Sequence, residues 1–510
     1  MRWGALRVSA GQDGVPAGAE TIRREPLIFE RRLRRVVQRG GGARAGDPPL
    51  SPDIAFLAAH GIPEHVLQLA SRLAALRGTA PLQELFATGF DRATYWSLLA
   101  RQLGLPFASD LSTAALVAHA GSTTAEAVRL ASSVLVDVGG ATILVVAPGK
   151  DELAALQARL HENPAMRRRV WIAAPETIRA FLVARRHTAL THYALNRLPH
   201  VLPRLSARRL GIERMRGPAT LAAACLAMAL VAPVASLTVL GIVSTLFFFN
   251  CCVWKAVAAF RRHRPLRVEP VPSAELPSYT VLVPLYREER VVADLVRNLT
   301  RMDYPASKLQ ILLLLEADDP ACRAAVAREV TSPVFEVLIV PPGGPRTKPK
   351  ALTYALPLAR GEFVVVFDAE DRPQPDQLRK AAAAFRERPD LGCVQARLAP
   401  DHEGSWLAKM FKLEYAANFE VLLPSLADCR VPIPLGGTSN HFPRRVLERV
   451  GAWDPFNVTE DADLGIRLAR FGYRTATILS RTYEEAPLRF RQWLPQRRRW
   501  IKGWMQTSLL

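Results

Sequence analysis

Residues 364–371 read VVVFDAED, and this stretch decides the fold of the half of the chain around it. Its apolar, mostly β-branched start is typical of a buried strand, which runs directly into the carboxylates of Asp368, Glu370 and Asp371. Carboxylate oxygens suit Mg²⁺ or Mn²⁺, and ligands of open α/β sheets collect at the carboxyl ends of strands. The stretch therefore predicts a metal site that holds a nucleotide's diphosphate, with a solvated acidic turn as the alternative.

The composition narrows the class of partner. The chain has 510 residues, enough for two or three domains, with a formal charge of +20. Such a charge fits nucleic acid, an anionic membrane or a phosphorylated substrate, but the sequence has no zinc-finger spacing or basic-aromatic run. The basic residues gather beside one apolar segment, so we expect membrane lipids and no nucleic acid. Six sparse cysteines without framework spacing favour a reduced, cytoplasmic setting.

The amino-terminal third divides into three parts. Residues 1–50 are rich in arginine and lack a signal-peptide core, which predicts a disordered basic arm, either on anionic lipid or simply solvated. From 51 to 185, helical periodicity and two apolar runs around Gly139-Gly140 predict a small α/β domain with a β-hairpin. Residues 186–216 are interpreted as a basic linker.

An uncharged segment follows, from Gly217 to Trp254, and it is 38 residues long. A transmembrane helix needs about 20 apolar residues, so this length predicts two spans with Pro233 near the turn. A single long tilted helix is the alternative. Basic residues flank both ends and such flanks stay in the cytoplasm, so residues 217–259 are expected to form a transmembrane hairpin. The globular parts are then on the cytoplasmic side of a multi-pass inner-membrane protein.

A second globular domain is expected over residues 278–505, where strands and helices alternate as in a doubly wound α/β sheet. The expected strands lie in YTVLVPL, LQILLLLE, VFEVLIV and VVVF, and carboxylates follow several of them. Residues 506–510 are expected to begin a further membrane region of a truncated sequence.

The order of motifs in this domain resembles the family 2 glycosyltransferases, in their membrane-embedded, cellulose-synthase-like branch. The motifs are VPLYREE, LLEADD, KPKALTYAL, FDAED, LGGTSNHFPR, VTEDADLGIRLARFGYRT and QRRRW. The resemblance implies a GT-A-type (Rossmann-like) fold and an inverting, metal-dependent transferase. It also implies that a hexose or N-acetylhexosamine moves from a nucleotide sugar, expected to be a UDP-sugar, to a growing polysaccharide or a lipid-linked acceptor.

The resemblance assigns catalysis to the Thr-Glu-Asp motif at Thr459, Glu460 and Asp461, whose Asp is implied to be the general base on the acceptor hydroxyl. Thr and Asp also cap helices well, which is the alternative for this motif. At the acidic turn, Asp368 and Glu370 are implied to hold Mg²⁺ or Mn²⁺ on the diphosphate. The family usually has Asp-x-Asp where this chain has Asp-Ala-Glu-Asp, so Asp371 stays open as the second ligand.

Further residues are implied to bind the nucleotide sugar. Lys350 is implied to meet the diphosphate, and Lys348 can share that task. The nearby Gly437 is expected to let the backbone approach the acceptor, and Trp453 to line the same cleft. The full predicted nucleotide-sugar set is Tyr286, Glu288, Asp318, Lys350, Gln496, Arg499 and Trp500.

The stretch LARQLGLPF, residues 99–107, resembles the N-terminal domain of type II secretion ATPases. That resemblance implies a regulatory or docking role for residues 51–185, with cyclic di-GMP as a candidate ligand, although the RLG-type motifs are degenerate here. Two rivals to the enzyme therefore stay open. One is a cyclic di-GMP-responsive receptor, and the other is a non-catalytic scaffold subunit of a polysaccharide synthase.

Overall fold

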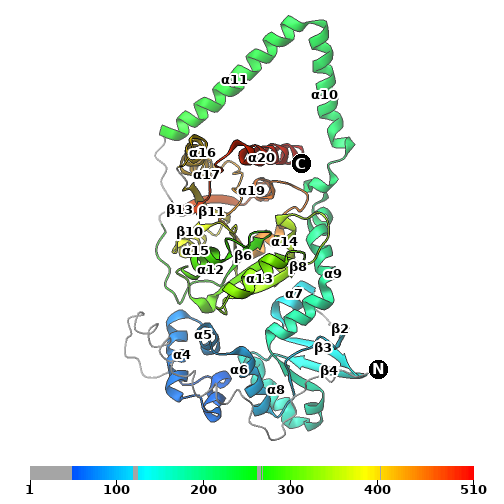
Figure 1. Cartoon of the computed structure of the whole chain (residues 1–510), viewed down its shortest axis with the longest axis vertical. Helices are drawn as coiled ribbons and strands as arrows, with labels where there is room; N and C mark the ends of the chain where they lie inside the picture. The colour runs from blue at the N-terminus through cyan, green and yellow to red at the C-terminus, as the bar shows by residue number, and fades with distance from the viewer. Residues whose placement is uncertain (1–48, 119–123, 261–265, 267, 402–403) are drawn as a thin grey trace.

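The chain has three parts along its long axis (Figure 1). An N-terminal module lies at one end, a larger α/β module occupies the middle, and two long helices project at the other end. Most of the basic arm expected at residues 1–50 lies outside the described residues. The computed structural model describes residues 49–118, 124–260, 266, 268–401 and 404–510.

The N-terminal module is α/β, as the sequence predicts. Val138 of β3 pairs antiparallel with Ala141 of β4, and φ is +63° at Gly139 and +86° at Gly140 between them. Glycine tolerates such positive φ, so the predicted hairpin is confirmed. The strands, in the order β1-β5-β4-β3-β2, are β1 (Phe107–Ala108), β2 (Ala115–Ala118), β3 (Ser133–Val138), β4 (Ala141–Val146) and β5 (Val170–Ala173). The helices are α3 (Pro52–Ala55), α4 (Glu64–Arg77), α5 (Pro81–Ala87), α6 (Arg92–Leu103), α7 (Thr124–Leu130), α8 (Lys150–Glu162) and α9 (Pro175–Val201).

Helix α9 extends beyond the predicted domain boundary. Residues 186–201, predicted as a linker, form its second half, and Leu190, Ala194 and Leu198 are buried along it. Residues four apart lie on one face of a helix, so this half of α9 packs as a structural element. It also lies against α14 of the next module. The linker is therefore shorter than predicted and is confined to residues 202–211.

The apolar segment forms α10 (Ile212–Val231) and α11 (Pro233–Phe260), which meet at Ala232. The predicted break next to Pro233 is therefore present. Large apolar side chains are exposed along both helices, for example Leu230 at 78% and Phe249 at 66%. Among the helices of the described residues, α11 is the one that is both long enough and apolar enough to cross a membrane.

The middle module is built on an eight-stranded sheet in the order β10-β13-β11-β12-β9-β6-β7-β8. The strands are β6 (Tyr279–Leu285), β7 (Leu309–Glu316), β8 (Phe335–Val340), β9 (Phe363–Val366), β10 (Arg372–Pro373), β11 (Leu391–Pro400), β12 (Asn440–Pro443) and β13 (Arg474–Glu484). The helices are α12 (Val292–Thr300), α13 (Pro320–Glu329), α14 (Lys348–Ala355), α15 (Gln377–Glu387), α16 (Trp406–Ala416), α17 (Leu423–Asp428), α18 (Arg444–Arg449), α19 (Glu460–Arg470) and α20 (Phe490–Leu509). The short helical turns of the chain are η1 (Phe56–His60), η2 (Pro164–Arg168), η3 (Pro203–Leu205), η4 (Ala207–Arg209), η5 (Ala306–Lys308), η6 (Leu356–Leu358) and η7 (Ala417–Leu422).

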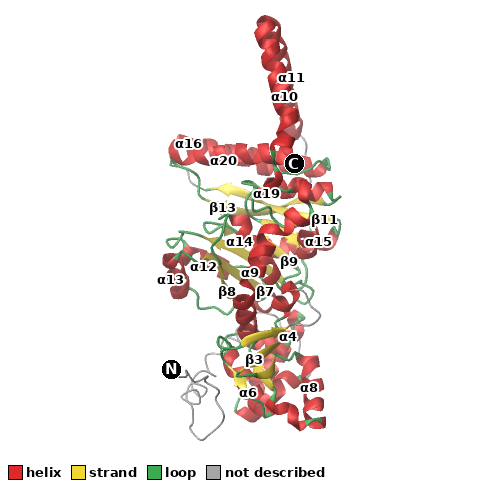
Figure 2. Ribbon diagram, turned by 90° about the vertical axis from the view of Figure 1, so that its right-hand side faces the viewer, coloured by secondary structure: helices red, strands yellow, loops and turns green. Residues whose placement is uncertain are grey.

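The sheet sets the position of the acidic turn. Strands β9, β6, β7 and β8 are parallel neighbours, which confirms the predicted block of strands. Every residue of β9 is buried, as its apolar run predicts. Since parallel strands end at one edge, the loops after β6, β7 and β9 lie together. Figure 2 shows α16 and α20 lying across the end of the module from which α10 and α11 project.

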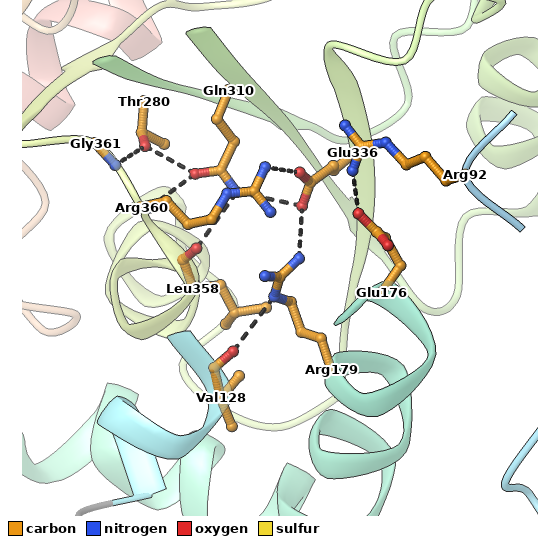
Figure 3. Close-up of polar contacts among 10 residues, drawn as sticks. All are labelled: Arg92, Val128, Glu176, Arg179, Thr280, Gln310, Glu336, Leu358, Arg360 and Gly361. Carbon is orange, nitrogen blue, oxygen red and sulfur yellow. Dashed lines mark hydrogen bonds and ion pairs between the residues drawn. The ribbon is translucent and has the colours of Figure 1, made fainter. Parts of the chain in front are cut away.

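A polar cluster around the half-buried Glu336 of β8 joins the two modules (Figure 3). The carboxylate of Glu336 pairs with Arg360 and lies 3.5 Å from the guanidinium of Arg179 on α9. The side-chain amide of Gln310 donates to Glu336 at 3.2 Å, and Nε of Arg179 donates to the carbonyl of Val128 at 3.3 Å. Because the buried side chains of Arg179 and Gln310 find their partners across this contact, it favours one orientation of the modules.

Candidate active site

The turn after β9 separates the three predicted metal ligands into two kinds. Asp371 is buried, and its Oδ2 accepts hydrogen bonds from the hydroxyl of Thr438 and from the backbone N–H of Asp368 at 2.7 Å. Asp371 therefore holds the turn together. Asp368 is half-buried and Glu370 is exposed, so these two remain available to a ligand.

Lys348, the first residue of α14, lies at the centre of this turn. Its Nζ donates to Oδ1 of Asp368 at 2.5 Å and to the carbonyl of Gly437 at 2.7 Å. Burial lowers the pKa of Lys348, but the charges of Asp368, Glu460 and Asp461 outweigh burial and raise it above its ordinary value. Lys348 is therefore a firmly charged cation at the acidic turn.

Lys350, the lysine that the sequence analysis placed on the diphosphate, lies elsewhere. It is fully buried, and its Nζ donates to the carbonyls of Pro341 at 2.6 Å and Gly343 at 3.1 Å. Burial lowers its pKa. Residues two apart on a helix point to different sides, so only one lysine of the KPK motif can face the turn. The structure places Lys348 there, whereas Lys350 points to the loop after β8.

The Thr-Glu-Asp motif meets the same cluster. Glu460 and Asp461 lie in the first turn of α19, and a Cβ on Gly437 would be 3.6 Å from Oδ2 of Asp461. The side chain of Thr459 does not cap α19 and interacts instead with Asn457. The cap alternative for Thr459 is therefore not what the structure shows, and Asp461 lies on the glycine whose carbonyl holds Lys348.

The cluster carries more carboxylates than its lysine can balance. Burial and the charges of Asp368 and Glu370 raise the pKa of Glu288 to about 7. Burial and Asp461 raise the pKa of Glu460 to about 7, and burial and Asp368 raise that of Glu484 to about 8. Burial also raises the pKa of Asp461. Burial is the larger cause of each raised pKa, and the neighbouring carboxylates add to it, so a further positive charge would stabilise the ionised acids.

This charge balance fits a divalent cation bound together with a substrate. Asp368 and Glu370 offer carboxylate oxygens, which are the ligands that Mg²⁺ and Mn²⁺ prefer. Within the described ranges, no three His, Cys, Asp or Glu side chains already form a complete ion cage. Such a site is typical of ions held by one or two carboxylates with substrate phosphates and water supplying the remaining ligands.

Glu484 was missed by the sequence analysis. It ends β13 and lies close enough to Asp368 and Glu370 for their charges to raise its pKa. The signal in the sequence is the carboxylate pair in RTYEEAP at the end of a strand. Assigning it to the cluster requires the strand order, because β13 lies between β11 and β10, and β10 directly follows the acidic turn.

The loops after β6 and β7 form a second group around Arg346, which the sequence analysis also missed. The guanidinium of Arg346 lies 5.7 Å from the ring centre of Tyr286, donates to its hydroxyl at 3.1 Å, and pairs with Asp318 at 2.8 Å. The adjacent Asp319 is the N-cap of α13, where it accepts from the backbone N–H of Cys322. Asp318 is therefore the acid that faces outward, beside an aromatic ring.

Helix α20 carries the three predicted residues of the QRRRW motif. Gln496 and Arg499 line a cavity of about 570 Å³ together with Gln492 and Glu485. Trp500 lies apart from that cavity, and the guanidinium of Arg497 is 4.3 Å from its ring centre. One face of the indole is thus covered by Arg497, which leaves less of it for a sugar ring than expected.

Helix α20 also packs directly on the Thr-Glu-Asp motif. A Cβ on Gly503 would be 2.0 Å from the hydroxyl oxygen of Thr459, so only glycine permits this contact. The side chain of Gln506 accepts from the backbone N–H of Val458, and Asn457 donates to Thr507, both at 3.1 Å. The motifs on α19 and α20 are therefore parts of one site.

Trp453 does not line the cleft as expected. It is only 3% exposed and packs edge-to-face against Phe442, with ring centres 6.1 Å apart. Its carbonyl accepts from the hydroxyl of Thr353 on α14. Trp453 is therefore a core residue that joins α14 to the segment before the Thr-Glu-Asp motif.

The middle module matches a known protein family. Residues 277–503 match the family described as "Glycosyltransferase like family 2". The chain therefore carries a glycosyltransferase family 2 domain, and the match supports the mixed α/β, GT-A-like fold that the sequence predicts.

Three curated relatives align with this domain. The "Probable glycosyltransferase YdaM" of Bacillus subtilis is 23% identical over 239 residues, 45% of this chain and 56% of that protein. A "Beta-monoglucosyldiacylglycerol synthase" of Trichormus variabilis is 28% identical over 40% of this chain and 44% of that protein. The "Probable glucomannan 4-beta-mannosyltransferase 1" of Arabidopsis thaliana is 25% identical over 44% and 43%. The chain thus spans about half the length of the curated relatives it matches.

Two solved structures are also similar. The mannosyltransferase PcManGT of Pyrobaculum calidifontis, in complex with GDP-Man and Mn²⁺, is 25% identical and has a TM-score of 0.43 over 52% of this chain and 73% of that chain. The S. aureus TarS fragment 1–349, in complex with UDP-GlcNAc, is 16% identical, with a TM-score of 0.32 over 41% and 59%. These TM-scores are too low to carry the bound nucleotides or the ion over to this chain.

Proposed function

We propose that this chain is a membrane-bound, inverting glycosyltransferase that moves a sugar from a nucleotide sugar to a growing polysaccharide or a lipid-linked acceptor. The observation that carries the proposal is the convergence of Asp368 and Asp461 on Lys348, within a family 2 domain. The names of the curated relatives support both kinds of acceptor, since one is a diacylglycerol glycoside synthase and another a glucomannan mannosyltransferase.

The donor is proposed to lie across the loops at the carboxyl ends of β6, β7 and β9. The aromatic ring of Tyr286 and the carboxylate of Asp318 suit a nucleotide base and ribose, with Arg346 joining the two. Lys348 suits the diphosphate because it is the firmly charged cation beside Asp368. A UDP-sugar is the proposed donor, on the motif resemblance alone.

Asp368 and Glu370 are the residues proposed to hold Mg²⁺ or Mn²⁺. When bound, such an ion neutralises the negative charge that develops on a departing diphosphate. Lys348 supplies part of that neutralisation from the protein itself, because its Nζ is already fixed at the turn by two hydrogen bonds.

Asp461 is proposed to act as the general base. Its carboxylate takes the proton of an acceptor hydroxyl, whose oxygen attacks the anomeric carbon while the bond from that carbon to the diphosphate breaks. One displacement of this kind inverts the configuration and needs no covalent nucleophile. The raised pKa of Asp461 suits this role, because a base works best when its pKa approaches the working pH.

Membrane attachment is proposed through α10 and α11 as a transmembrane hairpin of an inner-membrane protein. Both helices expose large apolar side chains along their length, and α10 begins and α11 ends at the same end of the middle module (Figure 1). The globular modules are then cytoplasmic by the distribution of basic flanks. Helix α19, which begins with Glu460 and Asp461, packs on α20 at the end of the module that faces these helices (Figures 1 and 2).

The experiment that tests this proposal is release of nucleoside diphosphate from a panel of sugar nucleotides, in membranes that carry the full chain. Release from one donor, stimulated by Mg²⁺ or Mn²⁺ and abolished by a chelator, supports the enzyme and names its sugar. No release from any donor, with the protein folded, favours the scaffold or receptor function instead. Titration of the full chain with cyclic di-GMP separates those two.

A further inference from the structure

The segment that leads into the Thr-Glu-Asp motif is bordered by the N-terminal module. Nη2 of Arg197, on α9, donates to the carbonyl of Glu448 at 2.5 Å, and the side chain of Glu448 pairs with Arg129 of α7 at 2.6 Å. A Cβ on Gly451 would be 2.5 Å from Cδ1 of Leu198, and φ at Gly451 is +88°. Helix α9 therefore runs closely along residues 448–451.

Beyond the end of α9, the linker also contacts the middle module, at Asp454. This side chain is completely buried, and its Oδ2 accepts from the backbone N–H of Ala207 at 2.6 Å. Its Oδ1 accepts from the hydroxyl of Ser206 at 3.3 Å and from the backbone N–H of Phe456 at 3.1 Å. Ser206 and Ala207 belong to the linker that enters α10, so Asp454 joins that linker to the catalytic module.

The chemistry at Asp454 requires a carboxylate. Two of its three partners are backbone N–H groups, and they approach different oxygens. An asparagine offers one acceptor oxygen and one NH₂ group, so either orientation of its amide faces an N–H donor with another donor. A buried donor without an acceptor is costly, and the loop is expected to move to relieve it.

The loop that begins at Asp454 also contacts both the Thr-Glu-Asp motif and the segment that carries Lys348. It opens the short loop that ends at Thr459, directly before Glu460 and Asp461. The carbonyl of Pro455, in the same loop, accepts from the hydroxyl of Thr347 at 3.0 Å, one residue before Lys348. A displacement of this loop therefore reaches the base and the lysine together.

We propose that Asp454 is a positioning residue that fixes Asp461 through the linker between α9 and α10. The inference rests on the proposed function, because it assigns a cause to the placement of the proposed general base. The N-terminal module, through α9 and its contact with Glu336, holds one end of the linker (Figure 3), and the membrane helix α10 holds the other. A movement of either end of this linker then changes the rate of sugar transfer, although the linker itself does not contact the donor.

The test compares Asp454→Asn with the wild-type chain in membranes, on the donor that the panel identifies. The matched control is Asp294→Asn, at an exposed aspartate of α12 that pairs with Arg297 of the same helix. We expect Asp454→Asn to lower kcat about 10- to 100-fold, since a misplacement of about 1 Å costs that much. The donor KM and the protection against heating by nucleoside diphosphate are expected to stay within about twofold of wild type.

A second variant approaches the contact from the linker. Ala207→Pro removes the N–H that Oδ2 of Asp454 accepts, and Ala207 is the first residue of η4, where proline fits. Ser206 has φ −110° and ψ 132°, the conformation that precedes proline. The same selective loss of kcat is expected, and this variant decides the question if Asp454→Asn does not fold.

Three results bear on the inference. Selective loss of kcat in both variants supports it. A wild-type kcat in Asp454→Asn overturns it, as does an equal loss of kcat and of nucleotide protection, which indicates a merely structural carboxylate. A wild-type chain that releases no nucleoside diphosphate overturns the proposed function first, so the two failures are distinguishable.

Discussion

The assignment of Lys348 rather than Lys350 to the diphosphate can be tested with one matched pair of substitutions. Methionine replaces lysine with an uncharged, unbranched side chain of similar length and high helix propensity. Both lysines lie in the first turn of α14, so Lys348→Met and Lys350→Met change the helix equally. Any difference between the variants then comes from what each ammonium group contacts.

The expected effect of Lys348→Met follows from its two hydrogen bonds. Its ammonium lies 2.5 Å from Asp368 and 2.7 Å from the carbonyl of Gly437, at the position proposed for the diphosphate. A hydrogen bond to a charged group contributes about 1.5–3 kcal/mol, so the donor KM is expected to rise about 10- to 150-fold. Lys348 also lowers the pKa of Glu460 and Asp461, and its loss is expected to raise both pKa values.

Lys350→Met is expected to affect stability instead. Its ammonium donates to the carbonyls of Pro341 and Gly343, which lose that donor in the variant. The expected cost is about 1–3 kcal/mol of unfolding free energy, and each kcal/mol lowers Tm by about 2–4 °C in a domain of this size. The donor KM is expected to stay near the wild-type value.

The assay is nucleoside diphosphate release against donor concentration, with Tm measured on the same preparations. We expect a raised KM for Lys348→Met, and a lowered Tm with a normal KM for Lys350→Met. The opposite pattern refutes the placement of the two lysines and restores the assignment from the sequence.

Two further predictions concern the cluster and its support. The pKa values of Glu288, Glu460 and Glu484 are raised from the ordinary 4.5 to about 7, 7 and 8. The protonated forms of these groups therefore stabilise the fold fully below pH 4.5, and this contribution to the free energy of unfolding is lost as the pH rises to about 8. Without divalent ions, Tm should therefore fall from pH 5 to 8.5, and Glu484→Gln should flatten that slope; a flat wild-type profile contradicts the raised pKa values. Gly503→Ala forces a methyl group against Thr459 and should lower kcat at least about 10-fold with little change in donor KM, whereas Gly404→Ala, whose Cβ meets nothing, should match wild type.

Local patterns predicted much of the fold. The apolar run of β9, the glycine pair between β3 and β4, and the break at Pro233 each depend on neighbouring residues and are present. The second half of α9 was missed because it was assigned, together with the arginine-rich residues 202–216, to one basic linker. Its signal was the four-residue spacing of Leu190, Ala194 and Leu198, which is a helical period.

The parts of the candidate site that the sequence did not predict depend on contacts between residues far apart in the chain. The two lysines of KPK are chemically alike, and only the rotation of α14 in the module separates them. Glu484 reaches the cluster through the position of β13 in the sheet, and Arg346 through the loops that surround it. Strand order and loop placement are set by long-range packing, which residue types in one window do not encode.

The central claim is that Asp461 acts as the base on the acceptor, and Asp461→Asn tests it most directly. On the donor that the panel identifies, the account predicts a fall in kcat of about 10²- to 10⁴-fold, while nucleoside diphosphate still protects the variant against heating as it protects wild type. Because the amide cannot accept the proton, transfer should fail although donor binding persists. Turnover of Asp461→Asn near the wild-type rate would contradict the account and remove Asp461 from the chemistry.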